Sequence, residues 1–193
     1  MKTPAYTFKM LLMLLAVTVA CKKDTVHVSA YTQEWLQTKT DTKLYFTSHT
    51  GEKEELTIKV QKDTRTYSGK FGANKSEYYW LTYTGLQSDL GLIVVAEQDY
   101  LDIRNIGQPD FNAYFATLIT AKNQADEQVM AREVEAELIN NLDLNGTQYE
   151  RVFRVKFNLP PHRPDKIHEI YYAKKHGLVY FQTIDGQYWS IDK

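Results

Sequence analysis

The chain has 193 residues, which is the usual length of one folded domain, so a single hydrophobic core is expected. Aromatic residues make up 13% of the chain and include 14 tyrosines, a composition that excludes an intrinsically disordered protein. The net charge of −1 gives no basic excess, so nucleic acid is not an expected partner.

The first twenty residues have the layout of a secretory signal peptide. Lys2 and Lys9 precede an apolar run that begins at Met10 and ends at Ala20. The run is eleven residues long, whereas a helix that spans a membrane needs roughly 20. We therefore expect residues 1–20 to be a leader that is removed, and not a permanent membrane anchor.

Cys21, the single cysteine, lies directly after this run, in the sequence Thr18-Val19-Ala20-Cys21. This segment resembles the lipobox of bacterial lipoproteins, and the resemblance implies that Cys21 is lipidated. Such an anchor would be effectively permanent, because each buried methylene group contributes ~0.8 kcal/mol. The alternative is an ordinary signal peptide with a chance cysteine at its cleavage site. A lone cysteine also excludes an intramolecular disulfide and a cysteine-based zinc site.

Lys22, Lys23 and Asp24 follow the cysteine and resemble the surface-export tag of lipoproteins from Bacteroidota. The resemblance implies an outer-membrane protein whose domain faces either the periplasm or the medium. The alternative is a charged, solvated tether of the kind that follows many lipidated cysteines. We expect a lipidated cysteine and flexible tether over residues 21–30 and a single β-rich domain over residues 31–193.

The first half of the mature chain has strong strand signals. Apolar and polar residues alternate with the period of two that half-buried strands require, and a turn at residues 49–52 separates the first two runs. The run at residues 92–95 is continuously apolar, which predicts a strand buried on both faces. The strands predicted in this half cover residues 44–47, 56–60, 76–84, 92–95 and 100–103.

The middle of the chain fits its patterns less clearly. Residues 111–119 are compatible with either a helix or a strand. The alanine, glutamate, glutamine and arginine content over residues 122–131 favours a loop or a short helix. Apolar residues that alternate from Val134 onward predict a strand that continues to Leu144.

The last fifty residues predict a hairpin followed by a meander. Asn145-Gly146 is a strong hairpin signal because both residues tolerate the positive φ of a type I′ turn. The odd-numbered residues over 149–157 share one face of the predicted returning strand. After a proline-rich loop, three strands are predicted over residues 167–191. The expected fold is mainly β, an antiparallel sandwich or a curved half-barrel, with at most one or two short helices.

The order of short motifs in residues 145–189 carries a second resemblance. The motifs are Tyr149-Glu150-Arg151-Val152-Phe153, Glu169-Ile170-Tyr171-Tyr172-Ala173-Lys174, Gly177-Leu178-Val179 and Asp185-Gly186-Gln187-Tyr188-Trp189. This order is similar to the C-terminal part of many small lipoproteins of unknown role from Bacteroidota. The motifs are structural, so the resemblance implies no activity.

Five aromatic residues on predicted strands are candidates for a ligand-binding face, because rings stack on apolar surfaces of ligands while hydroxyl groups fix their orientation. The candidates are Tyr78, Trp80, Tyr171, Tyr188 and Trp189. Alternatively, these rings fill the core or stiffen the sheet. The leading hypothesis is a non-catalytic domain that binds an envelope protein, a glycan or a lipid. A cavity enclosed by the sheet would favour a small hydrophobic ligand, and an exposed aromatic patch would favour a protein or a glycan.

The alternative function is a hydrolase that acts on envelope or extracellular polymers. His162, His168 and His176 lie close in sequence, with Asp165 and Glu169 beside them. A hydrolase would require at least two of these side chains to converge in a cleft. The chain has no Gly-x-Ser-x-Gly motif and no His-Glu-x-x-His motif. We therefore predict no catalytic residue, no cofactor and no metal.

Overall fold

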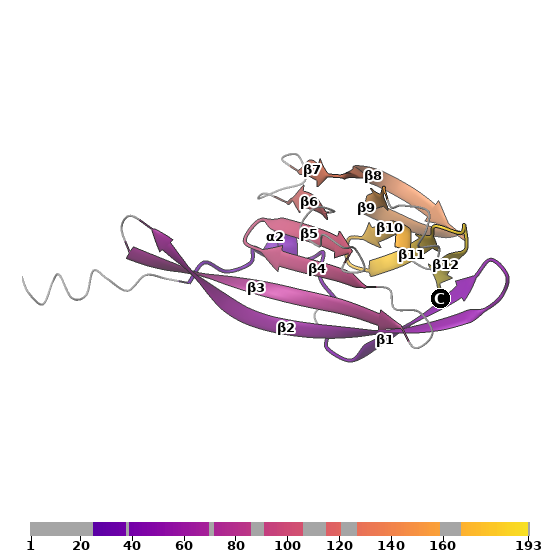
Figure 1. The fold of residues 1–193 in the computed structure, drawn as a ribbon, viewed down its shortest axis with the longest axis horizontal. Helices are drawn as coiled ribbons and strands as arrows, with labels where there is room; N and C mark the ends of the chain where they lie inside the picture. Colours follow the sequence, from indigo (N-terminus) through magenta and orange to yellow (C-terminus); the bar gives the residue numbers. More distant parts are fainter. Residues whose placement is uncertain are drawn as a thin grey trace, which may run out of the picture.

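The computed structural model describes residues 25–37, 39–69, 72–85, 91–105, 115–120, 127–158 and 167–192. These residues form twelve strands and one short helix (Figure 1). The strands are β1 Thr42–Ser48, β2 Lys53–Gly69, β3 Gly72–Gly85, β4 Leu92–Glu97, β5 Tyr100–Asn105, β6 Phe115–Ile119, β7 Gln128–Arg132, β8 Val134–Leu144, β9 Thr147–Phe157, β10 Ile167–Ala173, β11 Gly177–Thr183 and β12 Tyr188–Ile191; the helix is α2, Ala30–Gln33.

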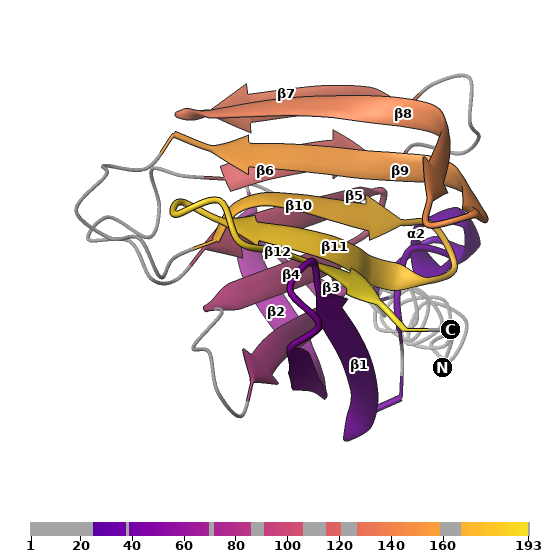
Figure 2. The same ribbon diagram turned by 90° about the vertical axis from the view of Figure 1, so that its right-hand side faces the viewer.

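All twelve strands belong to one antiparallel sheet with the order β7-β6-β5-β4-β3-β2-β1-β12-β11-β10-β9-β8. Strands that follow one another in the chain are neighbours in the sheet except β7 and β8, which stand at its two ends, and the pairing of β1 with β12 joins its two halves. Only Glu133, with a φ of 54°, separates β7 from β8, so the chain turns a corner there. The sheet therefore curls into a nearly closed, barrel-like shape (Figure 2). The predicted mainly antiparallel β class is confirmed.

The inside of this curled sheet is filled with side chains. Because a strand directs alternate residues to opposite faces, the parts of the strands that form the barrel send every second residue towards the core. The largest fully buried side chains are Trp35, Tyr83, Tyr172, Phe46, Phe153, Phe157, Phe181, Leu56, Ile58, Leu81 and Leu92. Aromatic rings therefore occupy much of the interior.

Helix α2 lies in a segment for which the sequence pattern predicted no element. Ser29 is its N-cap, and the Ser29 hydroxyl oxygen accepts a hydrogen bond from the Thr32 N–H at 3.2 Å. The chain after the helix buries Trp35 completely in the main core. The N–H of Lys175 donates to the carbonyl of Glu34 at 2.7 Å, which ties this segment to the turn after β10.

Two predictions in the second half of the chain are wrong. Residues 128–131 were expected in a loop or short helix, but they lie in β7, because pairing with β6 outweighs their helix propensity. The odd-numbered residues of β9 were expected to share one face, but Arg151 has a φ of 56° and breaks the alternation. Phe153 therefore enters the main core, whereas Tyr149 packs in a second, smaller cluster.

The distal parts of β2 and β3 project from the barrel as a two-stranded arm (Figure 1). We call residues 59–69 and 72–77 the β-arm. The side chains from Gln61 to Tyr67 are all exposed. The predicted tether reaches this arm, because the Val26 N–H donates to the Lys75 carbonyl at 2.9 Å and the Val26 carbonyl accepts from the Glu77 N–H at 2.8 Å.

Replacement of Trp35 tests whether the α2 segment belongs to the core. We expect Trp35→Ala to lower the free energy of unfolding by about 3–5 kcal/mol, the usual cost of removing a buried large aromatic side chain. Tyr45→Ala is the control, since Tyr45 is 51% exposed and should lose less than about 0.5 kcal/mol. Urea unfolding of both variants measures the difference, and equal losses would contradict the assignment.

Candidate functional site

A polar groove runs along the barrel beside the tip of the β8–β9 hairpin. It consists of three adjoining hollows of about 390, 340 and 360 Å³. The first two share Thr147, Ile191 and Asp192, and the last two share Lys175 and His176. We call these three neighbouring hollows together the end groove. It is lined by Gln37, Thr47, Ser48, His49, Leu144, Asn145, Thr147, Gln148, Tyr149, Glu150, Arg151, Lys174, Lys175, His176, Val179, Tyr188, Ser190, Ile191 and Asp192.

His49 and Tyr188 form the aromatic end of the groove. Their rings are stacked, with centroids 4.5 Å apart and planes inclined by 20°. The His49 N–H donates to the Tyr188 carbonyl at 3.1 Å, so the β1–β2 turn is fixed against β12. Tyr188 is 42% exposed. The site therefore presents a braced aromatic pair that remains accessible to a ligand.

The hairpin tip forms the opposite wall. Asn145 and Gly146 have φ values of 52° and 74°, which confirms the predicted turn with two positive φ angles. The Asn145 side-chain amide donates to the Ser190 hydroxyl at 2.7 Å. This bond holds the tip against β12 and closes the first hollow on one side.

The other end of the groove contains the basic side chains Arg151, Lys174, Lys175 and His176, together with Glu150. Arg151 forms an ion pair with Glu127, whose carboxylate also accepts a hydrogen bond from the Tyr31 hydroxyl at 2.9 Å. Lys174 lies 3.3 Å from the Glu34 carboxylate and 3.6 Å from the centroid of the Tyr31 ring. The neighbouring carboxylates offset much of the positive charge, so this end does not select strongly for anions.

A row of stacked tyrosines extends from the groove across the sheet. Tyr180 lies between Tyr171 and Tyr188, with centroid distances of 4.6 and 6.0 Å. Arg154 lies opposite Tyr171 in the register and bonds the Glu137 carboxylate at 2.6 Å and the Glu169 carboxylate. Stacked rings cover one another's faces, so the row presents mainly ring edges and hydroxyl groups. We call Tyr171, Tyr180 and Tyr188 the tyrosine ladder.

Two of the five predicted aromatic candidates lie in this ladder. Tyr180 stacks between Tyr171 and Tyr188. It was not among the predicted candidates, although it lies at one of the outward-facing positions of β11. Trp189 instead stacks on Phe181 at 4.9 Å and packs against the main core.

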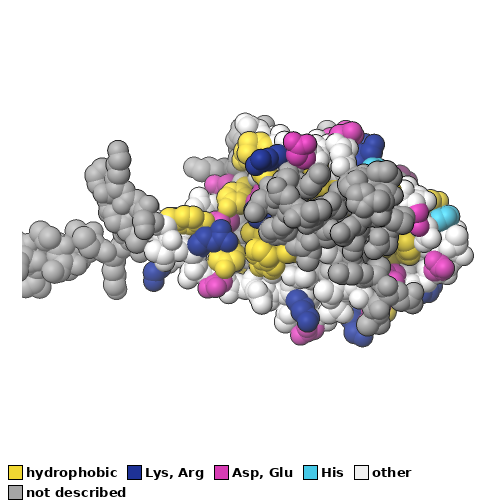
Figure 3. Space-filling view, viewed as in Figure 1, with side chains coloured by type: hydrophobic (Ala, Val, Ile, Leu, Met, Phe, Trp, Pro, Cys, Tyr) yellow, Lys and Arg dark blue, Asp and Glu magenta, His cyan; other side chains and the backbone are white. Residues whose placement is uncertain are grey.

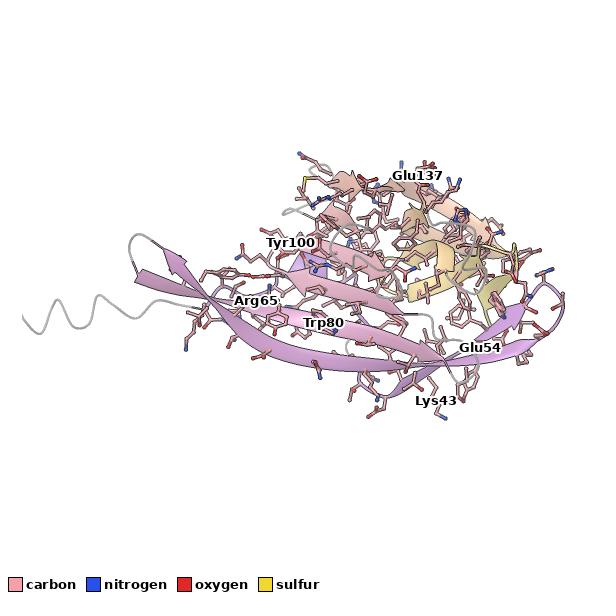
Figure 4. The ribbon with its side chains drawn as sticks, viewed as in Figure 1. Lys43, Glu54, Arg65, Trp80, Tyr100 and Glu137 are labelled. Atoms are coloured by element: carbon pink, nitrogen blue, oxygen red, sulfur yellow. The ribbon has the colours of Figure 1, made fainter. Side chains whose placement is uncertain are left out.

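The remaining two candidates lie on another part of the sheet. Tyr78 and Trp80 are on β3 (Trp80 is labelled in Figure 4). The guanidinium of Arg65 lies 4.9 Å from the centroid of the Tyr78 ring. These two side chains do not line the end groove.

The predicted histidine cluster is only partly within the described residues. His168 Nδ1 lies 3.0 Å from the Phe157 carbonyl oxygen, whereas His176 lies in the turn at the far end of β10, edge-on to Tyr149. Glu169 is bonded to Arg154. His162, Asp165, Cys21, Lys22, Lys23 and Asp24 lie outside the described residues. Within the described ranges, no three His, Cys, Asp or Glu side chains are grouped closely enough to hold a metal ion.

Around the grey atoms in Figure 3, the visible acidic and basic side chains are interspersed. No helix in the described part of the chain is long and apolar enough to cross a membrane. Comparison of the chain with protein-family models, with curated proteins and with solved structures finds no match. The groove and the ladder are therefore interpreted from their own chemistry.

The tyrosine ladder should make stability depend on alkaline pH. Burial, together with the neighbouring Tyr171, raises the pKa of Tyr180 to about 12 from its ordinary value of 10.0. Since the fold favours the neutral phenol, Tyr180 contributes to the free energy of unfolding. This contribution is fully present below about pH 10 and is lost as the pH rises towards about 12. We expect the unfolding free energy of Tyr180→Phe to fall less steeply in this window. Urea unfolding measured across it provides the test, and identical slopes for the two proteins would contradict the assignment.

Proposed function

We propose that the protein is a lipid-anchored envelope protein whose β domain binds a glycan chain in the end groove without catalysing a reaction. The observation that carries this proposal is the series of neighbouring hollows with the stacked pair of His49 and Tyr188 at one end. Sugar rings combine apolar C–H faces with many hydroxyl groups. The exposed edge of the Tyr188 ring and the many hydrogen-bonding side chains of the groove match both features.

The lining of the groove favours a hydroxyl-rich ligand over a lipid. Uncharged polar side chains supply donors and acceptors along its length, and these are Gln37, Thr47, Ser48, Asn145, Thr147, Gln148 and Ser190. The interior of the sheet is a poor acyl-chain site, because Trp35, Tyr83 and Tyr172 fill it. A lipid would have to displace these rings.

The surface favours a glycan over a large protein partner. Stable protein interfaces usually centre on a contiguous apolar patch with aromatic anchors. The exposed large hydrophobic side chains in the described residues are spread over five strands or segments: Val26, Tyr45, Tyr67, Met130 and Tyr188. Only Tyr188 among them lines the end groove. An elongated polar groove instead suits a chain of sugar units.

The support for the membrane anchor is the position of Cys21 after the apolar leader. The tether is short, because the chain pairs with β3 from Val26, five residues after the cysteine. Five residues span at most about 18 Å when fully extended. The β-arm would therefore lie close to the lipid surface.

Replacement of Tyr188 tests glycan binding. We expect Tyr188→Ala to weaken the affinity for a bound oligosaccharide roughly tenfold, because loss of one ring contact costs about 1–1.5 kcal/mol. Tyr78→Ala is the matched control, since it removes a tyrosine outside the groove. A glycan array identifies the oligosaccharide, and titration calorimetry compares the three proteins. Failure to bind any glycan, or equal losses in both variants, would contradict the proposal.

Replacement of Cys21 tests the anchor. Cys21→Ala removes the only thiol that could be acylated, so we expect no incorporation of labelled palmitate and release of the domain into the soluble fraction. Lys22→Ala is a control that should still be lipidated. A Cys21→Ala chain that stays in the membrane fraction would count against the anchor. Protease treatment of intact cells then shows which side of the outer membrane carries the domain.

A further inference from the structure

The β-arm has an open edge along β2. β1 pairs with β2 only as far as Ile58, and from Lys59 to Gly69 the described pairing of β2 is with β3 alone. Such an edge is a template for another strand, and an isolated two-stranded ribbon in water is only marginally stable. From Gln61 to Tyr67 the side chains of the arm are exposed. Pairing with a further strand would therefore bury surface that the single copy leaves in water.

The backbone groups on the open edge belong to the even-numbered residues. The Thr64 N–H donates to the carboxylate of the preceding residue, Asp63, at 2.7 Å. The Val60 N–H donates to the Thr40 hydroxyl oxygen at 3.4 Å. Neither N–H is directed at β3. Because backbone directions alternate along a strand, Lys62, Thr64 and Thr66 present their N–H and C=O groups to the open edge.

We propose that two copies of this chain pair through their β2 edges, antiparallel, with Thr64 opposite Thr64 of the second copy. The length of the edge supports this register. The edge runs from residue 59 to residue 69, and its midpoint is residue 64. Centring the pair there places Lys59 of one copy opposite Gly69 of the other, so the two open β2 edges cover each other over their whole length.

The charges select the same register independently. Centring on Lys62, Asp63 or Arg65 would place identical charges directly opposite one another, which is destabilising. Centring on Thr64 places Asp63 of each copy opposite Arg65 of the other, twice by symmetry. It also gives a threonine pair at the centre, another favourable cross-strand combination. The four-stranded ribbon that results is closed by a two-fold axis, as in most homodimers.

The side chains from Gln61 to Tyr67 are exposed (Arg65 is labelled in Figure 4). In the single copy the Tyr78 hydroxyl donates to the Asp63 carboxylate at 3.4 Å and Arg65 lies over the Tyr78 ring. The Tyr67 hydroxyl donates to Glu97 of β4 at 2.7 Å. Pairing would require Asp63 and Arg65 to turn from Tyr78 towards the second copy.

In the dimer, the Asp63 carboxylate would leave the Thr64 N–H and pair with Arg65 of the second copy. The Thr64 N–H would then donate to the Thr64 carbonyl of the second copy. Each backbone group on the edge then has a partner.

A cysteine at the proposed axis tests the pairing and its register. Directly opposed residues in an antiparallel pair have Cα atoms about 5.5 Å apart, within the range of a disulfide. In the full chain expressed with its own leader, Thr64→Cys should give a covalent dimer on non-reducing gels. Thr66→Cys is the matched control on the same strand face, since the two copies of residue 66 would lie about 13 Å apart. Equal cross-linking of the two variants would overturn the proposal.

The charge pairs are tested in the Thr64→Cys chain. Asp63→Arg and Arg65→Asp each place like charges opposite one another, so either change should lower the yield of dimer at least about fivefold. The double variant Asp63→Arg with Arg65→Asp should restore the yield. A double variant as defective as either single variant would overturn the register, provided that circular dichroism shows all chains folded.

The same experiment in a Cys21→Ala background separates this inference from the proposed function. Dimerisation should persist there, because the arm does not use the lipid anchor. Glycan binding should likewise persist in Arg65→Asp, because Arg65 does not line the end groove. Loss of cross-linking in the Cys21→Ala background would mean that the membrane, and not the arm, brings the copies together.

Discussion

The pairing of β1 with β12 is the contact on which the rest of the structure depends. It is short, with Phe46 opposite Ile191, Thr47 opposite Ser190 and Ser48 opposite Trp189. The hydroxyl of Thr47 bonds Asp192 and lowers the pKa of that carboxyl, and Lys53 lies 3.0 Å from the same carboxylate. These few bonds convert two half-sheets into one curled sheet with a common core.

The same pairing also assembles the candidate site. His49 follows β1 directly and Tyr188 begins β12, so the register of the two strands stacks the two rings. The hairpin tip reaches the same place through the bond from Asn145 to Ser190. Three segments, around His49, Asn145 and Tyr188, thus meet at one groove although each is at least 43 positions from the next in the sequence. Closure of the sheet and formation of the groove are one event.

The sequence predicted individual strands well because their signals are local. Period-two alternation and the Asn145-Gly146 turn need only a few neighbouring residues to be recognised. The corner at Glu133 and the break at Arg151 were not predicted, because neither residue type favours a positive φ. Tertiary pairing imposes both conformations. The strand β7 was missed for a related reason, since its partner β6 overrides its helix-favouring composition.

The site was predictable only in part. Tyr171 and Tyr188 were recognised as aromatic residues on strands, but nothing local shows that Tyr180 joins them or that Trp189 turns into the core. Adjacent strand residues point to opposite faces, so the sequence could say that one of Tyr188 and Trp189 is buried but not which one. His49 was missed because its partner is 139 positions away. Register, which is a global property, decides all three cases.

The arm and the end groove lie at opposite ends of the molecule's long axis (Figure 1). The chain segment that leads to the proposed anchor enters the fold on the arm, at the hydrogen bonds of Val26 with Lys75 and Glu77. In the proposed antiparallel dimer the two barrels would lie at opposite ends of the paired arms, so both proposed anchors would leave from its middle and the ribbon would lie along the bilayer. The two end grooves would then lie at the far ends of the dimer, separated from each other along the membrane surface by the length of the paired arms.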